Sequence, residues 1–198
     1  MKYKKLYDDL YSSGYHANYK TSHTRHIYSL IQHYIKTRSK VLDIGCSNGA
    51  AMLKLSKMKY DMYGIDISKI AIDICKSRNI LKCKASSVAE IKFEDNFFDG
   101  LVSSDVMEHI DPSEIKSSIK ECYRVLKTGG RGVFLIATAV ELNKRWDSVA
   151  IRNNVPHLHT SIFDGNFWEN SFIEQGFRVK FKKDGVGGRD SIVLVIEK

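Results

Sequence analysis

The sequence predicts a Rossmann-like, doubly wound α/β fold, with a mainly parallel seven-stranded sheet and an antiparallel C-terminal strand. Short apolar segments that fit strands alternate along the chain with amphipathic segments that fit helices. A glycine turn follows the first apolar segment, and an acidic residue ends the second. The last two apolar segments can pair with each other across 184–188. This order predicts right-handed crossovers and one sheet.

The expected elements follow from the period of the apolar residues and from helix-start signals. The strands should cover Lys40 to Gly45, Tyr60 to Asp66, Leu81 to Lys84, Phe98 to Ser104, Arg131 to Thr138, Phe177 to Lys182 and Ser191 to Glu197. The helices should cover Gly49 to Met58, Ser68 to Ser77, Ser113 to Leu126 and Gly165 to Gln175. Ser68 and the Asp111-Pro112 pair are typical helix starts.

Two further segments flank this alternation. Residues 1–38 contain apolar side chains at helical spacing and should form a cap of one or two helices in front of a single domain at 39–198. Residues 139–163 show no regular period. Because loops longer than about 12 to 15 residues are usually functional or disordered, this segment is predicted to be a lid loop over the site.

Composition narrows the class of protein. The 198 residues carry a formal net charge of +8 and four cysteines without C-x-x-C spacing, so neither a zinc knuckle nor a disulfide framework is indicated. The N-terminus lacks the apolar stretch of a signal peptide, and no run reaches the roughly 18 apolar residues of a membrane span. A cytoplasmic protein is expected. The basic charge suits an anionic small molecule or RNA.

The run Val41-Leu-Asp-Ile-Gly-Cys-Ser-Asn-Gly49 indicates a nucleoside site. Glycines permit positive φ and close approach of a ligand to the backbone, and the following helix presents its N–H groups. Asp66 lies 21 positions after Gly45, near the roughly 20-residue spacing of an acid that meets ribose hydroxyls. The turn lacks the G-x-G-x-x-G pattern of dinucleotide folds, and Asp43 adds negative charge. A cationic amino-acid nucleoside fits better than a pyrophosphate.

With these motifs the chain resembles the class I S-adenosylmethionine-dependent methyltransferases. Further matches are Phe98-Asp-Gly-Leu-Val102, the stretch Arg124 to Gly130 and the strand Val133 to Ile136, so the resemblance spans about 41–138. It implies S-adenosylmethionine as cofactor and S-adenosylhomocysteine as product. The residues implied to bind the cofactor are Asp43, Gly45, Cys46, Ser47, Gly49, Asp66, Ile67, Ser87 and Ser104.

Two positions depart from that family's usual residues. Ser47 replaces the middle glycine of the first motif, and it either bonds the methionine part or only adjusts the turn. Ser86-Ser87 stands where relatives often have an acid that contacts adenine, and a serine oxygen would accept that bond more weakly. These departures leave open an inactive donor-binding regulator as one alternative function.

The catalytic groups are expected beyond the fourth strand and in the lid. Asp105, Glu108 and His109 would face one way if the chain turns helically there, and His157 and His159 alternate around Leu158. The catalytic candidates are therefore Asp105, His109, His157 and His159, with a histidine as general base. The two lid histidines are equally compatible with solvent-facing roles.

A divalent metal at this place is the alternative to a plain base. The arrangement resembles the E-x-x-E-H pattern, with a later histidine, of metal-dependent small-RNA terminal 2′-O-methyltransferases and of some quinone-pathway O-methyltransferases. The ligands would be Asp105, Glu108, His109 and His157. A metal is not favoured, because E-H at this strand end is widespread among metal-free relatives and the first acid is an aspartate.

Acceptor choice is assigned to the lid and the N-terminal segment. Arg145, Trp146 and Arg152 are suited to gripping an anionic or aromatic substrate, and Trp146 also fits a packing role. Tyrosines recur every four residues as one helical stripe, at Tyr3, Tyr7, Tyr11, Tyr15 and Tyr19. The residues expected to close the pocket are Tyr15, His16 and Arg25.

The predicted function is methyl transfer to an oxygen or nitrogen atom of a small molecule such as a sugar, a lipid precursor or another metabolite. Metal-assisted RNA 2′-O-methylation is the alternative, motivated by charge and by the carboxylate and histidine set. The sequence contains no signal for an oligomeric state.

Overall fold

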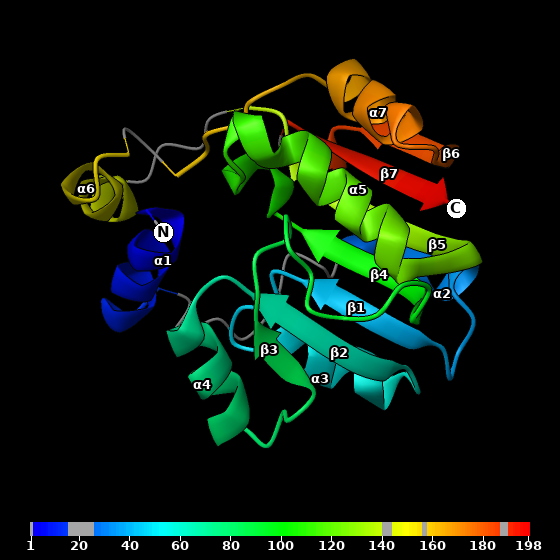
Figure 1. Cartoon of the computed structure of the whole chain (residues 1–198), viewed down its shortest axis with the longest axis horizontal. Coiled ribbons are helices and arrows are strands. Elements are labelled where there is room, and N and C mark those ends of the chain that lie inside the picture. The colour runs from blue at the N-terminus through cyan, green and yellow to red at the C-terminus, as the bar shows by residue number, and fades with distance from the viewer. Residues whose placement is uncertain (1, 16–25, 140–143, 156–157, 187–189) are drawn as a thin grey trace.

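The computed structural model describes residues 2–15, 26–139, 144–155, 158–186 and 190–198, without the side chains of residues 2 and 144–147. Its centre is one seven-stranded sheet in the order β3-β2-β1-β4-β5-β7-β6 (Figure 1). The strands are β1 Lys40–Ile44, β2 Asp61–Asp66, β3 Cys83–Ala85, β4 Phe98–Ser104, β5 Leu126–Ala137, β6 Arg178–Asp184 and β7 Ser191–Glu197. Only β7 runs antiparallel to its neighbours β5 and β6. The predicted fold class is confirmed.

Helices cover both faces of the sheet. One apolar cluster joins the sheet to α2 Tyr28–Tyr34, α3 Ala50–Lys57 and α4 Lys69–Ser77. The cluster on the other face includes residues of α5 Ile115–Val125 and α7 Gly165–Glu174. Ser68 accepts the Ala71 N–H as the N-cap of α4, and Asp164 accepts the Phe167 N–H at the start of α7. These caps set where the crossover helices begin.

Two boundaries differ from the sequence prediction. The fifth strand begins at Leu126 rather than at Arg131, because Leu126 is fully buried and pairs with Phe98 before the register shifts. The third strand is displaced to Cys83–Ala85. A 3-10 turn, Pro112–Glu114, precedes α5, with the Asp111 side chain accepting the Ser113 N–H as expected for a helix start.

The segment 139–163 was predicted to be an irregular lid loop, and this prediction was wrong for its central part. Residues Lys144–Arg152 form a helix, α6, in which Val149 and Ala150 are buried. Their partners are Leu6 and Leu10 of α1 Lys2–Ser12, with which they form a third apolar cluster. Polar residues dominate this segment, so its periodicity becomes visible only through the tertiary contact with α1.

Helices α1 and α6 lie side by side beyond the carboxyl ends of β1, β2 and β4 (Figure 1). The Asn153 side chain accepts a bond from Lys5 and donates one to Asp9, which ties the two helices together. Asp8 accepts a 2.7 Å bond from the Ser68 hydroxyl and so joins α1 to the start of α4. We call α1 and α6 the lid helices. Within the described residues, none of the helices combines the length and apolarity that crossing a bilayer requires.

Candidate functional site

The turn between β1 and α3 depends on two glycines. Gly45 has φ +72° and Gly49 has φ +78°, and a Cβ at these positions would overlap Val106 and Ile80 respectively. The Gly45 and Cys46 N–H groups both donate to the Ile65 carbonyl oxygen at 2.9 Å. The turn is therefore held against β2, and only glycine fits at both positions, because each has a positive φ and a packed side chain where its Cβ would be.

Ser47 also adopts a left-handed conformation, with φ +50°. Such a conformation costs a non-glycine residue roughly 1–2 kcal/mol. The Ser47 N–H donates to Asp66 Oδ2 at 3.0 Å, which offsets part of this cost. The serine therefore keeps the backbone geometry that a glycine would adopt, and the first of the two sequence departures leaves the turn intact.

Asp66 ends β2 and is buried, with 7% of its surface exposed. Its second oxygen, Oδ1, accepts the Ser68 N–H at 2.9 Å. Burial raises the pKa of this carboxyl group to about 6, while the bonds from Ser68, from Ser47 and from the Tyr11 hydroxyl lower it. The carboxylate is therefore held rigidly and is mostly ionised at neutral pH.

Asp43 lies on β1 beside Asp66 and is 4% exposed. Burial, followed by the charge of Asp66, raises its pKa to about 8. Its Oδ2 atom has no hydrogen-bond partner among the described residues. Cys46, in the same turn, has a thiol whose pKa is raised well above its ordinary value by the hydrogen bond with Cys75 and by burial. All four cysteines are buried, and the raised pKa of Cys46 makes it a poor nucleophile.

These residues fit S-adenosylmethionine. The tight glycine turn lies against Asp66, whose mostly ionised carboxylate is suited to binding ribose hydroxyls. The unpartnered Asp43 Oδ2 atom beside it belongs to a carboxyl group that is mostly protonated at neutral pH, so it adds a polar atom without a full negative charge. The remaining predicted contacts follow strand ends on the same edge of the sheet. Ile67 is half-buried after β2, and Ser104 ends β4. Ser87 Oγ follows β3 and accepts the Ala89 N–H.

The acceptor side begins after β4, and here the predicted helical face of three residues was wrong. Asp105 has φ +58° and is therefore in the left-handed region. The short 3-10 turn Met107–His109 follows it. The Asp105 side chain accepts the Ser104 hydroxyl at 3.1 Å. Glu108 is fully buried, and its Oε1 accepts the Ala137 N–H of β5 at 3.2 Å. The three residues therefore do not share one regular helical face, and Asp105 is not in the group of possible metal ligands that contains Glu108 and His109.

Two histidines from distant segments meet beside Glu108. His109 Nδ1 lies 3.0 Å from the Leu158 carbonyl oxygen, and His159 Nδ1 lies 3.3 Å from the Ala139 carbonyl oxygen. Their ring centroids are 4.7 Å apart. One possible ligand atom from each of Glu108, His109 and His159 lies within 4.8 Å of the others. His157, the other predicted lid histidine, lies outside the described residues.

Helix α1 brings two tyrosines to this site that the sequence analysis did not assign to it. Tyr11 is 7% exposed, and its hydroxyl bonds to the Asp66 carboxylate. The ring of Tyr7 packs edge-on against His109, with centroids 6.1 Å apart. The four-residue tyrosine stripe was the signal that could have found them.

The other residues expected to close the pocket are less informative. Tyr15 packs edge-on against Tyr11, with centroids 5.6 Å apart. Tyr19, His16 and Arg25 lie outside the described residues. Arg145 and Trp146 are on α6, with side chains that are not described, and Arg152, which ends this helix, is exposed.

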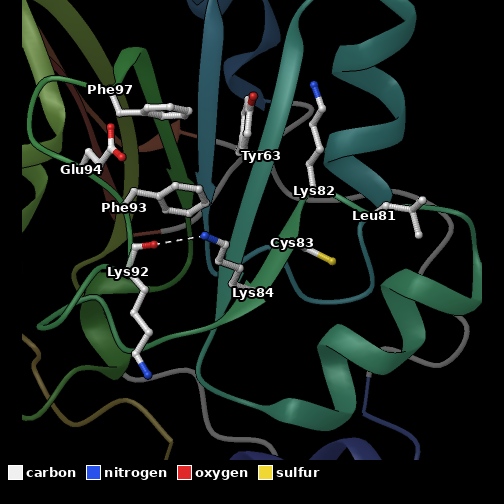
Figure 2. A pocket seen from close by; sticks show the side chains of 9 residues that line it. All are labelled: Tyr63, Leu81, Lys82, Cys83, Lys84, Lys92, Phe93, Glu94 and Phe97. Atoms are coloured by element: carbon white, nitrogen blue, oxygen red, sulfur yellow. Dashed lines mark hydrogen bonds between the residues drawn. The ribbon is translucent and has the colours of Figure 1, made fainter.

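A separate groove lies at the β2 and β3 edge of the sheet, where the link 86–97 forms neither helix nor strand. Figure 2 shows its lining, which encloses a cavity of about 630 Å³. Three lysines lie over aromatic rings here: Lys82 is 4.8 Å from the centroid of Tyr63, Lys84 is 4.2 Å from that of Phe93, and Lys40 is 4.6 Å from that of Phe97. The groove is basic and aromatic.

Comparison with known proteins identifies the type of domain in this chain. A family profile described as a methyltransferase domain matches residues 42–134, which contain the glycine turn, Asp66 and the Glu108-His109 pair. The chain therefore carries a methyltransferase domain, and its fold and donor turn match the class I S-adenosylmethionine-dependent type. S-adenosylmethionine is accordingly the cofactor of this domain, as the resemblance implied. The described positions of Gly45, Asp66 and Asp43 are consistent with that assignment.

Curated relatives of this methyltransferase differ in the reactions that their names state. A ubiquinone/menaquinone biosynthesis C-methyltransferase of Rickettsia bellii is 31% identical over 66% of this chain and 54% of the relative. A phosphoethanolamine N-methyltransferase of Plasmodium falciparum is 27% identical over 72% of this chain and 54% of the relative. The chain thus spans about half the length of these relatives.

Solved structures agree with the fold. A methyltransferase from Archaeoglobus fulgidus superposes with a TM-score of 0.70 at 19% identity, covering 95% of this chain and 100% of that one. The 1,6-didemethyltoxoflavin-N1-methyltransferase of Burkholderia thailandensis, solved with its substrate and S-adenosylhomocysteine, superposes with a TM-score of 0.72 at 13% identity, covering 100% and 89%. At these identities the likeness establishes the fold alone.

Proposed function

We propose that this methyltransferase transfers a methyl group to an oxygen or nitrogen atom of a small molecule such as a sugar, a lipid precursor or another metabolite. The observation that carries the proposal is the meeting of Glu108, His109 and His159 beside the donor-binding strand ends, under the lid helices. Bound S-adenosylmethionine supplies an electrophilic methyl group on a sulfonium. The protein must align the acceptor with it and remove one proton.

His109 is suited to that proton transfer. A backbone carbonyl can only accept a hydrogen bond, so the Leu158 oxygen at 3.0 Å places the proton of neutral His109 on Nδ1. Nε2 then has the basic lone pair. The same reasoning assigns the proton of His159 to Nδ1, opposite the Ala139 oxygen. Two imidazoles with assigned tautomers fit an acceptor that must lose a proton, namely a hydroxyl or an amine.

The lid supports a small acceptor. Leu158, which orients His109, also belongs to the apolar cluster of α1 and α6, so the lid packing and the base position are coupled. The relative that methylates phosphoethanolamine and the structural neighbour solved with a toxoflavin precursor both act on small molecules by their names. A net charge of +8 favours anionic members of this class.

The proposal is tested by methyl transfer from S-adenosylmethionine labelled in its methyl group. The acceptors are a panel of amines, alcohols, phenols and their phosphorylated forms, each analysed by mass spectrometry. We expect a methylated O or N product, with a rate that drops at least about 100-fold in His109→Gln. His33→Gln is the matched control, because His33 is exposed on α2. Methylation at carbon alone would contradict the proposed acceptor class. Donor binding without any transfer would instead favour the inactive regulator.

Metal-assisted methylation of an RNA 2′-hydroxyl is the second candidate. Two observations favour it: the Glu108, His109 and His159 ligand atoms lie within 4.8 Å of one another, and the lysine-lined aromatic groove would suit stacked bases. The ligand set differs from the predicted one, since Asp105 is not in the group. One equivalent of bound divalent metal, lost in His159→Gln, together with salt-sensitive methylation of a short oligonucleotide, would replace the first candidate by this one.

A further inference from the structure

The hydroxyl group of Tyr7 is buried, and it has no hydrogen-bond partner among the described residues. A buried hydroxyl without a partner costs about 1–3 kcal/mol. The neighbouring tyrosines of α1 do not share this condition. The Tyr3 hydroxyl donates to Asp111 Oδ2 at 3.1 Å, and the Tyr11 hydroxyl bonds to Asp66. One helix thus presents three successive tyrosines of its stripe to the domain and leaves only the middle one unsatisfied.

Tyr7 lies between the donor and acceptor halves of the site. Its ring contacts the His109 ring edge-on, and its hydroxyl is close enough to Asp66 and Glu108 to feel the charges of both carboxylates. The unsatisfied hydroxyl thus lies between Asp66 of the donor half and the His109 ring of the acceptor half.

Helix α1 is anchored on both sides of this position. Tyr3 is bound to Asp111, next to the 3-10 turn of His109, and Asp8 accepts the Ser68 hydroxyl beyond the end of β2. Leu6 and Leu10 are buried against α6. The helix cannot turn Tyr7 toward solvent without breaking these contacts. The favourable packing around Tyr7 therefore offsets the free-energy cost of its unsatisfied hydroxyl.

We propose that Tyr7 is a substrate-binding residue whose hydroxyl donates a hydrogen bond to an oxygen or uncharged nitrogen atom of the methyl acceptor, next to the atom that is methylated. This inference rests on the proposed function and specifies one contact of the same site. The acceptor then carries two neighbouring polar atoms. His109 removes the proton from the atom that is methylated, and Tyr7 donates a hydrogen bond to the other. Vicinal diols, catechols, amino alcohols and hydroxy acids belong to this class.

Tyr7 acts as a donor and not as a second base. Burial, followed by the nearby negative groups, raises the pKa of its phenol well above 10, so the proton stays on the oxygen at working pH. A Tyr7→Phe variant should therefore keep the pH profile of the wild type, whereas loss of a base would change it.

The experiment compares Tyr7→Phe with Tyr3→Phe, which removes a hydroxyl of the same helix that does have a partner. Without ligand, Tyr7→Phe should raise Tm by about 2 to 5 °C because an unsatisfied group is lost, and Tyr3→Phe should lower it by about 2 °C. The affinity for S-adenosylhomocysteine should stay the same in both. With catechol and amino-alcohol acceptors, Tyr7→Phe should lower kcat/KM for the acceptor about 10- to 100-fold without changing KM for the donor.

Different results would contradict the proposed function and the proposed role of Tyr7. No transfer by the wild type to any acceptor would overturn the proposed function. Normal kcat/KM in Tyr7→Phe, in an active enzyme, would overturn this inference alone. A fall in Tm of Tyr7→Phe like that of Tyr3→Phe would also overturn it, since the hydroxyl would then have a partner within the protein. A rise in Tm supports the inference even before an acceptor is identified.

Discussion

The donor half and the acceptor half of the site are built in different ways. In the donor half, Asp66 is positioned by backbone N–H groups of Ser47 and Ser68, both within a few residues of the strand ends. In the acceptor half, His109 is oriented by a carbonyl 49 positions away and packs against Tyr7 of the first helix. The backbone of the donor half is thus set by neighbouring residues, with Tyr11 and Asp8 of α1 adding contacts to it, whereas the groups of the acceptor half meet only when distant segments pack together.

This contrast has a consequence for stability. The sheet and its helices share two large apolar clusters, while the lid helices are held by a small cluster of their own. Regions with few buried contacts open at lower free energy than the rest of a domain. Changes in the donor half should therefore affect binding directly, and changes in the lid should affect the acceptor half first.

The largest effect is expected from Gly45→Val. The new side chain would overlap Val106, and its φ of +72° is unfavourable for a β-branched residue. Together these should abolish measurable binding of S-adenosylhomocysteine in calorimetry, a loss of more than about 1,000-fold. Gly129→Val is the matched control, because Gly129 has φ +75° with nothing within 4 Å of its Cβ position. Normal binding by Gly45→Val would show that the donor site lies elsewhere.

The second largest effect is expected from His109→Gln, which should impair the acceptor half and leave the donor half intact. Methyl transfer should fall at least about 100-fold, because the basic nitrogen is lost. Affinity for S-adenosylhomocysteine should remain within about twofold of the wild type, since the donor half does not depend on this ring. An equal loss of binding and transfer would mean that the two halves are not independent.

A smaller and local effect is expected from Leu10→Ala. Leu10 is fully buried in the lid cluster, and its truncation should cost about 2–5 kcal/mol. Hydrogen exchange should become faster in α1 and α6 and stay unchanged in β1 and β4. Leu101→Ala, in the main core, should instead lower the stability of the whole domain. Global destabilisation by Leu10→Ala would show that the lid is no separate unit.

The last effect is the smallest per unit of pH and concerns the pH dependence of stability through Asp43. Its folded pKa of about 8 lies above the ordinary value of 3.8, so the folded state retains a proton that the unfolded state releases. The free energy of unfolding should therefore fall as pH rises from about 4 to about 8, by at most about 1.4 kcal/mol per pH unit.

Asp43→Asn should flatten this slope and be more stable than the wild type at pH 8. The control is Asp73→Asn, on the exposed side of α4. Thermal unfolding between pH 5 and pH 8.5 measures both, and a slope that survives in Asp43→Asn would assign it to another group.

Sequence reasoning succeeded where structure is local. The glycine turn, the acid at the end of β2 and the pairing of the last two strands follow from neighbouring residues and from strand periodicity, and each is present. It failed at Asp105, where a helical turn was assumed and a left-handed residue breaks it, and at α6, whose buried face is defined by α1. Neither feature has a sequence signal that a local rule would recognise.

By itself, the sequence determined the sheet, the donor turn and the family of this chain, because these depend on backbone conformations and on spacings within one βαβ unit. The tertiary structure alone decided which histidine meets His109, that Asp105 adopts a left-handed conformation, and that Tyr7 and Tyr11 of α1 contact His109 and Asp66. These relations join segments up to about 100 residues apart. Their physical basis is the packing of apolar faces against one another. The periodicity of the sequence shows that a face is apolar, but it does not show which surface that face packs against.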